Sequence, residues 1–257
     1  MKAMASEMTE ILDAENLSKV VSLGHDWGCG LAQRLYNYFP ARVSALVMVN
    51  VAYMPPSEQP FDLDAALKLS EQVFGYGCYW YWKLFTSADG ADVLEKRLES
   101  SWTLLHGPPE TWRRNLCEEG ATRTYLERDQ RQDVQGYATE EKKRLFVERF
   151  ARDGFEGPLC WYKAYAGGLN GAEAKGMSEE GLVVRVPTLY VGFDQDVVCR
   201  HEAIGLAAQK GLLPKLTTKV LQGGHWGLLA RPKEFGETVV GWLDENFKTS
   251  RSRAGML

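Results

Sequence analysis

The chain contains two regions in which short apolar runs alternate with amphipathic stretches. Apolar runs of about four to eight residues followed by segments of helical period predict parallel strands alternating with helices. The run at 43–50 is too apolar to be half-exposed, which favours a central strand. The sequence therefore predicts an α/β fold with a doubly wound, mostly parallel sheet. We expect strands at 19–23, 43–50, 186–193 and 217–221, and helices at 5–16, 28–39, 203–210 and 232–246.

A different pattern fills the middle of the chain, where helical periodicity replaces the short apolar runs and aromatic residues are dense. This pattern is typical of a helical cap inserted into an α/β core. We expect a first core part at 1–60, a cap at 61–175, a second core part at 176–248 and a tail at 249–257. Within the cap, helices are expected at 64–74, 91–105, 109–121 and 139–150.

Residues 22–30 read Ser-Leu-Gly-His-Asp-Trp-Gly-Cys-Gly and join the first predicted strand to a helix. Gly24 and Gly28 flank Asp26, which is the small-x-nucleophile-x-small pattern of a nucleophile elbow. Small residues suit this turn because it leaves little room for Cβ atoms. Serine is the usual nucleophile, whereas an aspartate carboxylate needs no base at neutral pH and suits displacement at an sp3 carbon. A surface aspartate in an ordinary turn is the alternative.

An acid and a histidine follow later strands, and parallel sheets bind ligands beyond the carboxyl ends of their strands. Asp194 and Asp196 come after the third predicted strand, and His225 lies in a glycine-flanked loop after the fourth. His225 would act as general base on a water that hydrolyses an Asp26 ester, and an acid would fix its tautomer. We favour Asp196 for that acid and expect Asp194 to cap the loop. A structural role for His225 is the alternative.

Four segments carry a family resemblance: Gly24–Gly28, Gly154–Tyr162, Asp196–Val198 and Gly224–Trp226. They resemble the soluble epoxide hydrolases of the α/β-hydrolase superfamily, over a span from about residue 5 to residue 247. The resemblance implies an epoxide hydrolase that forms a vicinal diol from a small hydrophobic epoxide and water. It implies no cofactor and no metal.

The resemblance also implies two cap tyrosines that donate hydrogen bonds to the epoxide oxygen. Tyr162 matches the second of them by its segment, and Tyr81 matches the first through its spacing to Phe85, with Tyr79 as the alternative. A phenol can hold or protonate the alkoxide that ring opening creates. Haloalkane or haloacid dehalogenases share the elbow and the triad order but need no alkoxide donor. Tyr162 therefore favours epoxide hydrolysis over dehalogenation.

Three further residues are expected to bind substrate. The resemblance assigns the backbone N–H of Trp27 to the oxyanion hole, with His25 and Trp161 beside it. In the related haloalkane dehalogenases a tryptophan at the position of Trp27 also donates to halide. The elbow alone therefore does not separate the two reactions.

The chain departs from the family pattern before the elbow. The family has further strands there, with a His-Gly-x-Pro loop that supplies a second oxyanion donor, but few residues precede Gly24. His106–Pro109 matches those letters inside the cap and is interpreted as a turn. Strand 19–23 would then be an open apolar edge, which favours self-association. A truncated gene, a catalytically impaired relative and a chain that pairs with a partner are the open alternatives.

Composition excludes several other classes. The net charge of −4 argues against nucleic acid as a partner. No signal-like apolar core and no apolar run of about 20 residues is found, so we expect no membrane span and a cytoplasmic location. The C-terminal tripeptide is not a good peroxisomal address. Five scattered cysteines without a Cys-x-x-Cys pair indicate reduced thiols rather than a disulfide frame or zinc site.

Overall fold

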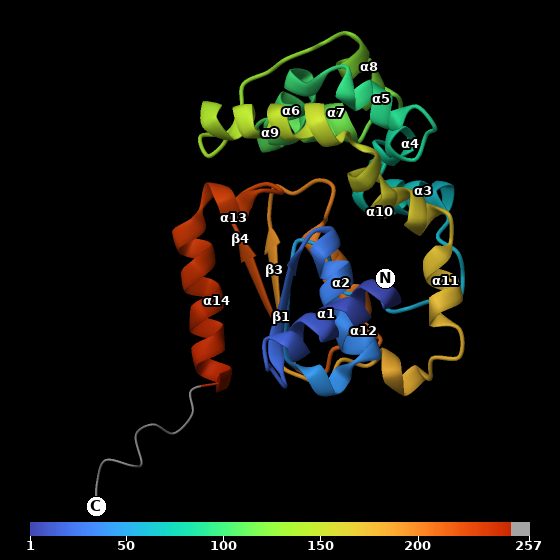
Figure 1. Cartoon of the computed structure of the whole chain (residues 1–257), viewed down its shortest axis with the longest axis vertical. Helices are drawn as coiled ribbons and strands as arrows, with labels where there is room; N and C mark the ends of the chain where they lie inside the picture. Colours follow the sequence, from blue (N-terminus) through green and yellow to red (C-terminus); the bar gives the residue numbers. More distant parts are fainter. Residues whose placement is uncertain (248–257) are drawn as a thin grey trace, which may run out of the picture.

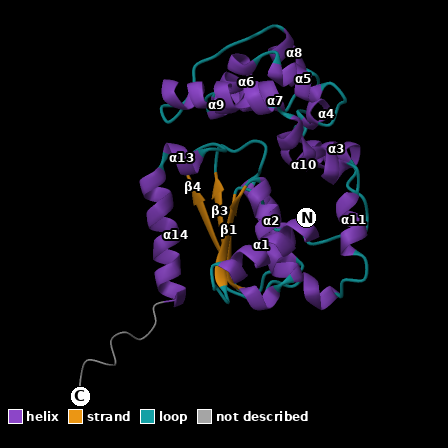
Figure 2. Ribbon diagram, in the orientation of Figure 1, coloured by secondary structure: helices purple, strands orange, loops and turns teal. Residues whose placement is uncertain are grey.

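A single parallel sheet forms the centre of the computed structural model, which describes residues 1–247. The tail predicted at 249–257 lies outside the described residues. The strands are hydrogen-bonded in the order β1-β2-β3-β4, and every neighbouring pair is parallel. Figure 2 shows the arrows of β3 and β4 pointing the same way. The predicted α/β class and parallel sheet are therefore confirmed. The strands are β1 Val20–His25, β2 Val43–Val49, β3 Thr188–Phe193 and β4 Leu216–Leu221.

Helices cover both faces of the sheet, which explains why β2 and β3 are almost entirely buried. On one face, Leu35 of α2 packs with Met48 and Tyr190 of the central strands. On the other face, Trp242 of α14 packs in a cluster with Val47. Figure 1 shows α14 on one side of the strands and α1 and α2 on the other. The helices of the core are α1 Lys2–Ala14, α2 Trp27–Tyr38, η1 Pro40–Arg42, η2 Glu179–Leu182, η3 His201–Ala203, α12 Ile204–Gln209, α13 Gly227–Ala230 and α14 Pro232–Phe247.

A run of helices separates β2 from β3 in the sequence. Figure 1 shows α4 to α9 beyond the carboxyl ends of the strands and α11 alongside the core. The inserted helical cap is thus present, while its boundaries at 61 and 175 remain a prediction. The cap helices are α3 Leu63–Phe74, α4 Trp82–Phe85, α5 Gly90–Glu95, α6 Leu98–His106, α7 Pro109–Leu116, α8 Ala121–Glu127, α9 Glu140–Asp153, α10 Glu156–Ala166 and α11 Leu169–Ala174.

The cap contains more breaks than its periodicity predicts. The helix expected at 91–105 is interrupted at Arg97, whose φ of −139° and ψ of 48° are not helical. The helix expected at 109–121 ends at Leu116, and Gly120 has a φ of 70° before α8 begins. Both predicted helices are therefore wrong in length, because the backbone leaves the helical region within each of them.

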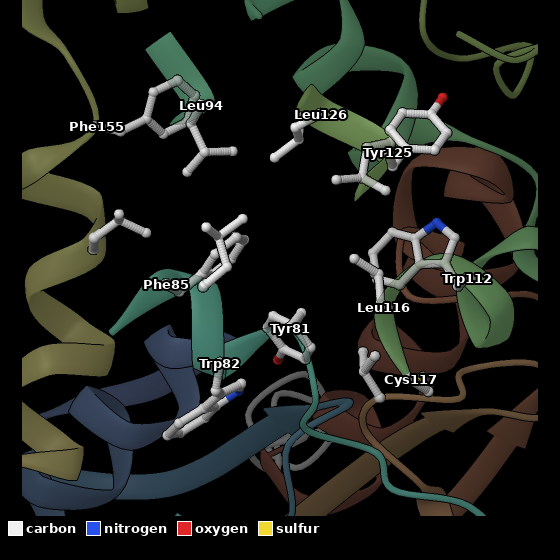
Figure 3. Close-up of a cluster of buried hydrophobic side chains, with 14 of the residues drawn as sticks. Tyr81, Trp82, Phe85, Leu94, Trp112, Leu116, Cys117, Tyr125, Leu126 and Phe155 are labelled. Atoms are coloured by element: carbon white, nitrogen blue, oxygen red, sulfur yellow. The ribbon is translucent and has the colours of Figure 1, made fainter. Parts of the chain in front are cut away.

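Many aromatic side chains of the cap pack together in one buried cluster. Tyr81, Trp82 and Phe85 belong to one buried cluster with residues of α5, α7 and α8 (Figure 3). The same cluster includes Val198, which lies in the loop after β3. The cap core is thus continuous with a core loop next to the sheet, and this contact positions cap side chains over the strand ends.

Strand β1 forms an edge of the sheet within the described part of the chain. Val21 and Leu23 are 36% and 50% exposed, although their partners across the β1–β2 ladder, Ala45 and Val47, are fully buried. The open apolar edge that the sequence predicts is therefore present among residues 1–247. No helix within that span is both long enough and apolar enough to cross a bilayer.

Candidate active site

The turn between β1 and α2 holds Asp26 in an unusual backbone conformation. Its φ is 52° and its ψ is −125°, a positive φ that non-glycine residues rarely adopt. The backbone N–H of Trp27 donates to Asp26 Oδ1 at 2.6 Å, and the N–H of Cys29 donates to the Asp26 carbonyl at 2.8 Å. Strained residues of this kind cost about 1–3 kcal/mol and persist where the surrounding structure enforces them. The geometry is that of a nucleophile elbow.

Close approach of two backbone segments explains one of the flanking glycines. A Cβ on Gly24 would lie 2.2 Å from the backbone C and O of Gly28 and 2.5 Å from the N of Cys29. A Cβ on Gly28, in contrast, would meet no atom within 4 Å. The requirement for a small residue therefore falls on Gly24, against which the backbone of residues 28 and 29 packs.

The loops after β3 and β4 bring Asp196 and His225 to the same place. Nδ1 of His225 lies 2.9 Å from Oδ2 of Asp196, and Nε2 of His225 lies 3.4 Å from Oδ2 of Asp26. Asp196 is 1% exposed and His225 is 8% exposed. An imidazole that donates from Nδ1 to Asp196 presents the lone pair of Nε2 toward Asp26. The three side chains thus have the geometry of a nucleophile–histidine–acid triad.

Asp196 is held by donors in addition to His225. Asn50 Nδ2 donates to its Oδ2 at 2.5 Å, and the backbone N–H groups of Val198 and Cys199 donate to its Oδ1 at 3.0 and 2.9 Å. A buried carboxylate needs such partners to remain charged. Burial alone would raise the pKa of Asp196, but His225 and these donors lower it below the ordinary value.

The titration of His225 follows from the same contacts. Burial favours its neutral form, while the charges of Asp196 and Asp26 favour the imidazolium and outweigh burial. The net effect is a pKa of His225 raised above the ordinary 6.5. Loss of the charge on Asp26 would remove one of the two groups that raise it.

Asp194, the other carboxylate of this loop, has a different position. It is exposed and accepts a hydrogen bond from the backbone N–H of Gly223 at 2.9 Å. Its contact joins the loop after β3 to the loop after β4. Asp196, and not Asp194, is the acid that contacts His225.

Two cavities meet at Asp26 and Tyr81, which line both of them. The first has a volume of about 150 Å³ and is lined mainly by apolar and aromatic side chains, including Trp27, Phe61 and Cys199. The second has a volume of about 230 Å³ and lies deeper in the cap, with His225 among its lining residues. Predominantly apolar lining with few polar groups is typical of small-molecule sites.

Both expected cap tyrosines lie at these cavities. Tyr162 on α10 lines the second cavity with Tyr81, and their rings are 5.9 Å apart at 80°. Burial raises the pKa of each phenol well above its ordinary value, and the negative charge of Asp26 contributes in the same direction. Both side chains are therefore protonated donors at neutral pH. Tyr79 lines only the first of the two cavities.

The other expected binding residues lie around the elbow. His25 Nε2 is 3.0 Å from the carbonyl oxygen of His225, and burial lowers the pKa of His25 to about 4. The indole of Trp161 stacks on that of Trp27 at 5.8 Å, yet Trp161 lines neither cavity. The structure thus brings Trp27 and His25 to the triad and places Trp161 behind Trp27.

Three residues at the site were not predicted from the sequence. Asn50 binds Asp196, Trp112 of α7 stacks on the His225 ring at 5.2 Å, and the Sγ of Cys199 lies 3.8 Å from Asp26 Oδ2. Asn50 stands at the end of a predicted strand, which is a usable signal. The sequence offers none for Trp112.

The turn at His106–Pro109 also adjoins the site. Trp226 Nε1 donates to the carbonyl of Leu105 at 2.8 Å, and the ring of His106 lies 5.5 Å from that of Trp226. This segment, whose sequence matches the His-Gly-x-Pro motif, therefore lies in the cap, next to the loop that carries His225.

The family model described as alpha/beta hydrolase fold matches residues 1–232. The chain therefore belongs to the α/β-hydrolase fold family. Among characterised proteins it is similar to bifunctional epoxide hydrolase 2 of Sus scrofa, with 24% identity over 247 residues, and to epoxide hydrolase srdG of Neurospora crassa, with 25% identity over 256 residues. Each match covers 95% of this chain, but only 42% of the first relative's length and 72% of the second's.

Solved structures give the same fold. An epoxide hydrolase from an endophytic Streptomyces superposes with a TM-score of 0.74 at 23% identity, over 93% of this chain and 72% of that one. Potato (Solanum tuberosum) epoxide hydrolase I superposes with a TM-score of 0.70 at 22% identity, over 94% and 75% of the two chains. About a quarter of each of those chains thus has no counterpart in the match.

Proposed function

We propose that this chain carries the active site of an epoxide hydrolase that works through a covalent ester on Asp26. The observation that carries the proposal is the alignment of Asp26, His225 and Asp196, with Tyr81 and Tyr162 at the same cavities. The names of the similar proteins favour the same activity.

In the first step, a carboxylate oxygen of Asp26 attacks one epoxide carbon. The carbon–oxygen bond of the ring breaks, and its electron pair goes to the ring oxygen. Tyr81 and Tyr162 hydrogen-bond that oxygen as it becomes an alkoxide, and a phenol proton neutralises it. The products of this step are a hydroxyl on the neighbouring carbon and an ester on Asp26.

In the second step, His225 Nε2 removes a proton from water, and the resulting hydroxide attacks the ester carbonyl. Asp196 stabilises the imidazolium that forms. The backbone N–H of Trp27, already directed at Asp26 Oδ1, would stabilise the oxyanion. Collapse of this intermediate breaks the bond between the ester carbonyl carbon and the substrate oxygen, and that oxygen takes the proton of the added hydroxyl, which releases the vicinal diol and restores the Asp26 carboxylate. The proton held by His225 returns to the tyrosine phenolate left by the first step.

The two cavities support a hydrophobic substrate with substituents on both sides of the epoxide. One substituent would occupy the first cavity, beside Trp27 and Phe61, and the other would occupy the second, beside Trp112 and Phe155. Asp26 and Tyr81 line both cavities, so an epoxide bound between them meets the nucleophile and a phenol together.

The test is diol formation by the purified full chain from a panel of aryl and alkyl epoxides, with Asp26→Ala as control. Turnover that disappears in the variant supports the proposal. Halide release from haloalkanes or haloacids, retained when Tyr81 and Tyr162 are changed to phenylalanine, would identify a dehalogenase instead. A folded sample without any turnover on the panel would favour an impaired relative.

A further inference from the structure

A thiol lies beside the catalytic carboxylate and is not used by the proposed reaction. Cys199 Sγ is 3.8 Å from Asp26 Oδ2, which is itself 3.4 Å from His225 Nε2. One ligand atom from each of these three side chains lies within 4.8 Å of the other two. A sulfur, a nitrogen and an oxygen from three different loops thus converge on one point.

These separations fit a common ion. Zinc bonds of about 2.0–2.3 Å at tetrahedral angles place neighbouring ligand atoms roughly 3.3–3.6 Å apart. The His225–Asp26 and Cys199–Asp26 separations are close to that range, and the Cys199 and His225 ligand atoms lie within 4.8 Å of each other. A fourth position would remain open toward the cavity that Asp26 and Cys199 both line.

The hydrogen bonds that hold the candidate ligand His225 also resemble those found around zinc sites. In such sites a histidine ligand usually donates its second ring N–H to a carboxylate, which fixes the tautomer. His225 has this arrangement, since its Nδ1 contacts Asp196 and leaves Nε2 free to bind a cation. Asp196 is itself held by Asn50 and two backbone N–H groups.

The local charge favours a cation. Asp26 and Asp196 both lie against His225, and the described residues provide no Lys or Arg ion pair to either carboxylate. Negative charge that no cationic side chain balances attracts a divalent ion.

We propose that Asp26, Cys199 and His225 form an inhibitory site for one thiophilic divalent cation, of which Zn²⁺ is the best example. Binding transfers the thiol proton of Cys199 to solvent and leaves a Zn–S bond, a Zn–N bond to neutral His225 and a Zn–O bond to Asp26. The cation thus occupies the nucleophile and the general base at once. The inhibitory part of this inference rests on the proposed function, whereas cation binding does not.

Binding is tested first, without any activity assay, by adding Co²⁺ to the tag-free full chain. Cobalt bound through a thiolate gives a sulfur-to-metal charge-transfer band in the near ultraviolet, and Zn²⁺ added afterwards should displace one equivalent. Cys199→Ser should remove the band and weaken Zn²⁺ binding by about a hundredfold or more, because loss of even an indirect partner costs about 10–100-fold. Cys160→Ser, which changes an exposed thiol on α10, should keep both the charge-transfer band and the Zn²⁺ affinity.

The second measurement is inhibition of epoxide turnover by buffered free Zn²⁺, expressed relative to each variant's own uninhibited rate. We expect reversal by a chelator and a dissociation constant for inhibition that shifts in Cys199→Ser but not in Cys160→Ser. An inactive chain that still shows the Cys199-dependent band would contradict the proposed function while supporting the site. Absence of the band, or a band that survives in Cys199→Ser, would overturn the site itself.

Discussion

Nε2 of His225 lies 3.4 Å from Oδ2 of Asp26, on the side of the imidazole opposite its contact with Asp196. One ring therefore connects the carboxylate proposed to form an ester with the carboxylate that orients the base. The two half-reactions depend on this ring differently, because Asp26 attacks without a base and the ester is hydrolysed only with one.

Substitution of the base should separate the two half-reactions. His225→Gln is expected to form the Asp26 ester but to hydrolyse it more than about a hundredfold more slowly, since positioned proton transfer contributes roughly that much or more. Intact-protein mass spectrometry after incubation with an epoxide should show one added substrate mass. Asp26→Ala should show no added mass, and an unmodified His225→Gln chain under the same conditions would argue against the covalent route.

The protonation of His225 should depend on the charge of Asp26. Burial lowers the pKa of His225, while Asp196 and Asp26 together raise it above 6.5, so Asp26→Asn should lower the pKa toward that value. NMR titration of the imidazole in the two proteins measures the change. Ester formation also neutralises Asp26. We therefore expect the rate of ester hydrolysis to fall to half its maximum, on the acid side, at a pH below the pKa of His225 that NMR gives for the free protein. An unchanged midpoint in Asp26→Asn would contradict this coupling.

The two cap tyrosines should act on rate more than on folding. Tyr81→Phe combined with Tyr162→Phe is expected to lower kcat for epoxides by about a hundredfold to a thousandfold, the usual cost of losing oxyanion donors. Tyr125→Phe is the matched control, because Tyr125 is buried in the same cluster, hydrogen-bonds Thr103 and lines neither cavity. Equal losses of activity in the double variant and in Tyr125→Phe would indicate a packing role only.

The two glycines of the elbow should differ in their tolerance of a methyl group. Gly24→Ala forces a Cβ to within 2.2 Å of backbone atoms of Gly28, so we expect a loss of several kcal/mol in unfolding free energy or failure to fold. Gly28→Ala meets no atom within 4 Å and lies in α2, so it should be neutral or stabilising by up to about 1 kcal/mol. Urea unfolding of both variants measures the difference, and similar losses in the two would contradict the packing account.

The exposed strand edge should influence association. Unpaired edges bind other edges, so we expect concentration-dependent self-association that Leu23→Lys reduces, because Leu23 is 50% exposed on β1. Leu206→Lys, at a residue 62% exposed on α12 away from the edge, is the control. Sedimentation velocity over a range of concentrations distinguishes them. An equal effect of both substitutions, or a monomer at every concentration, would show that this edge does not mediate association.

The sequence predicted the core well because burial on both faces leaves a local signature. Strands such as β2 and β3 are continuous apolar runs, and the elbow has fixed spacing around Asp26. The cap was less predictable. No helix is among the expected elements at 156–166, yet α10 begins at Glu156 and accommodates Pro158 in its first turn, where it needs no N–H.

The site was predictable in part for the same reason. Asp196 and His225 follow strands, so their convergence is set by the sheet. Trp112 reaches the site through a contact between segments far apart in the sequence, which no local pattern encodes, whereas Cys199 lies in the same loop as Asp196. At the break of the predicted 91–105 helix, the backbone N–H of Arg97 and the Oγ of Ser101 both donate to the Leu94 carbonyl, each at 3.1 Å.

The position of the helical insert between β2 and β3 has a consequence for engineering and for divergence. Asp26 precedes the insert, and Asp196 and His225 follow it, so all three triad side chains lie on turns and loops that follow strands of the sheet. The wall of the second cavity comes largely from the insert, and the first cavity is lined by insert and core residues together. Exchange of the segment between these two strands for that of a relative should therefore transfer substrate preference while the reacting carboxylate and its base stay in register.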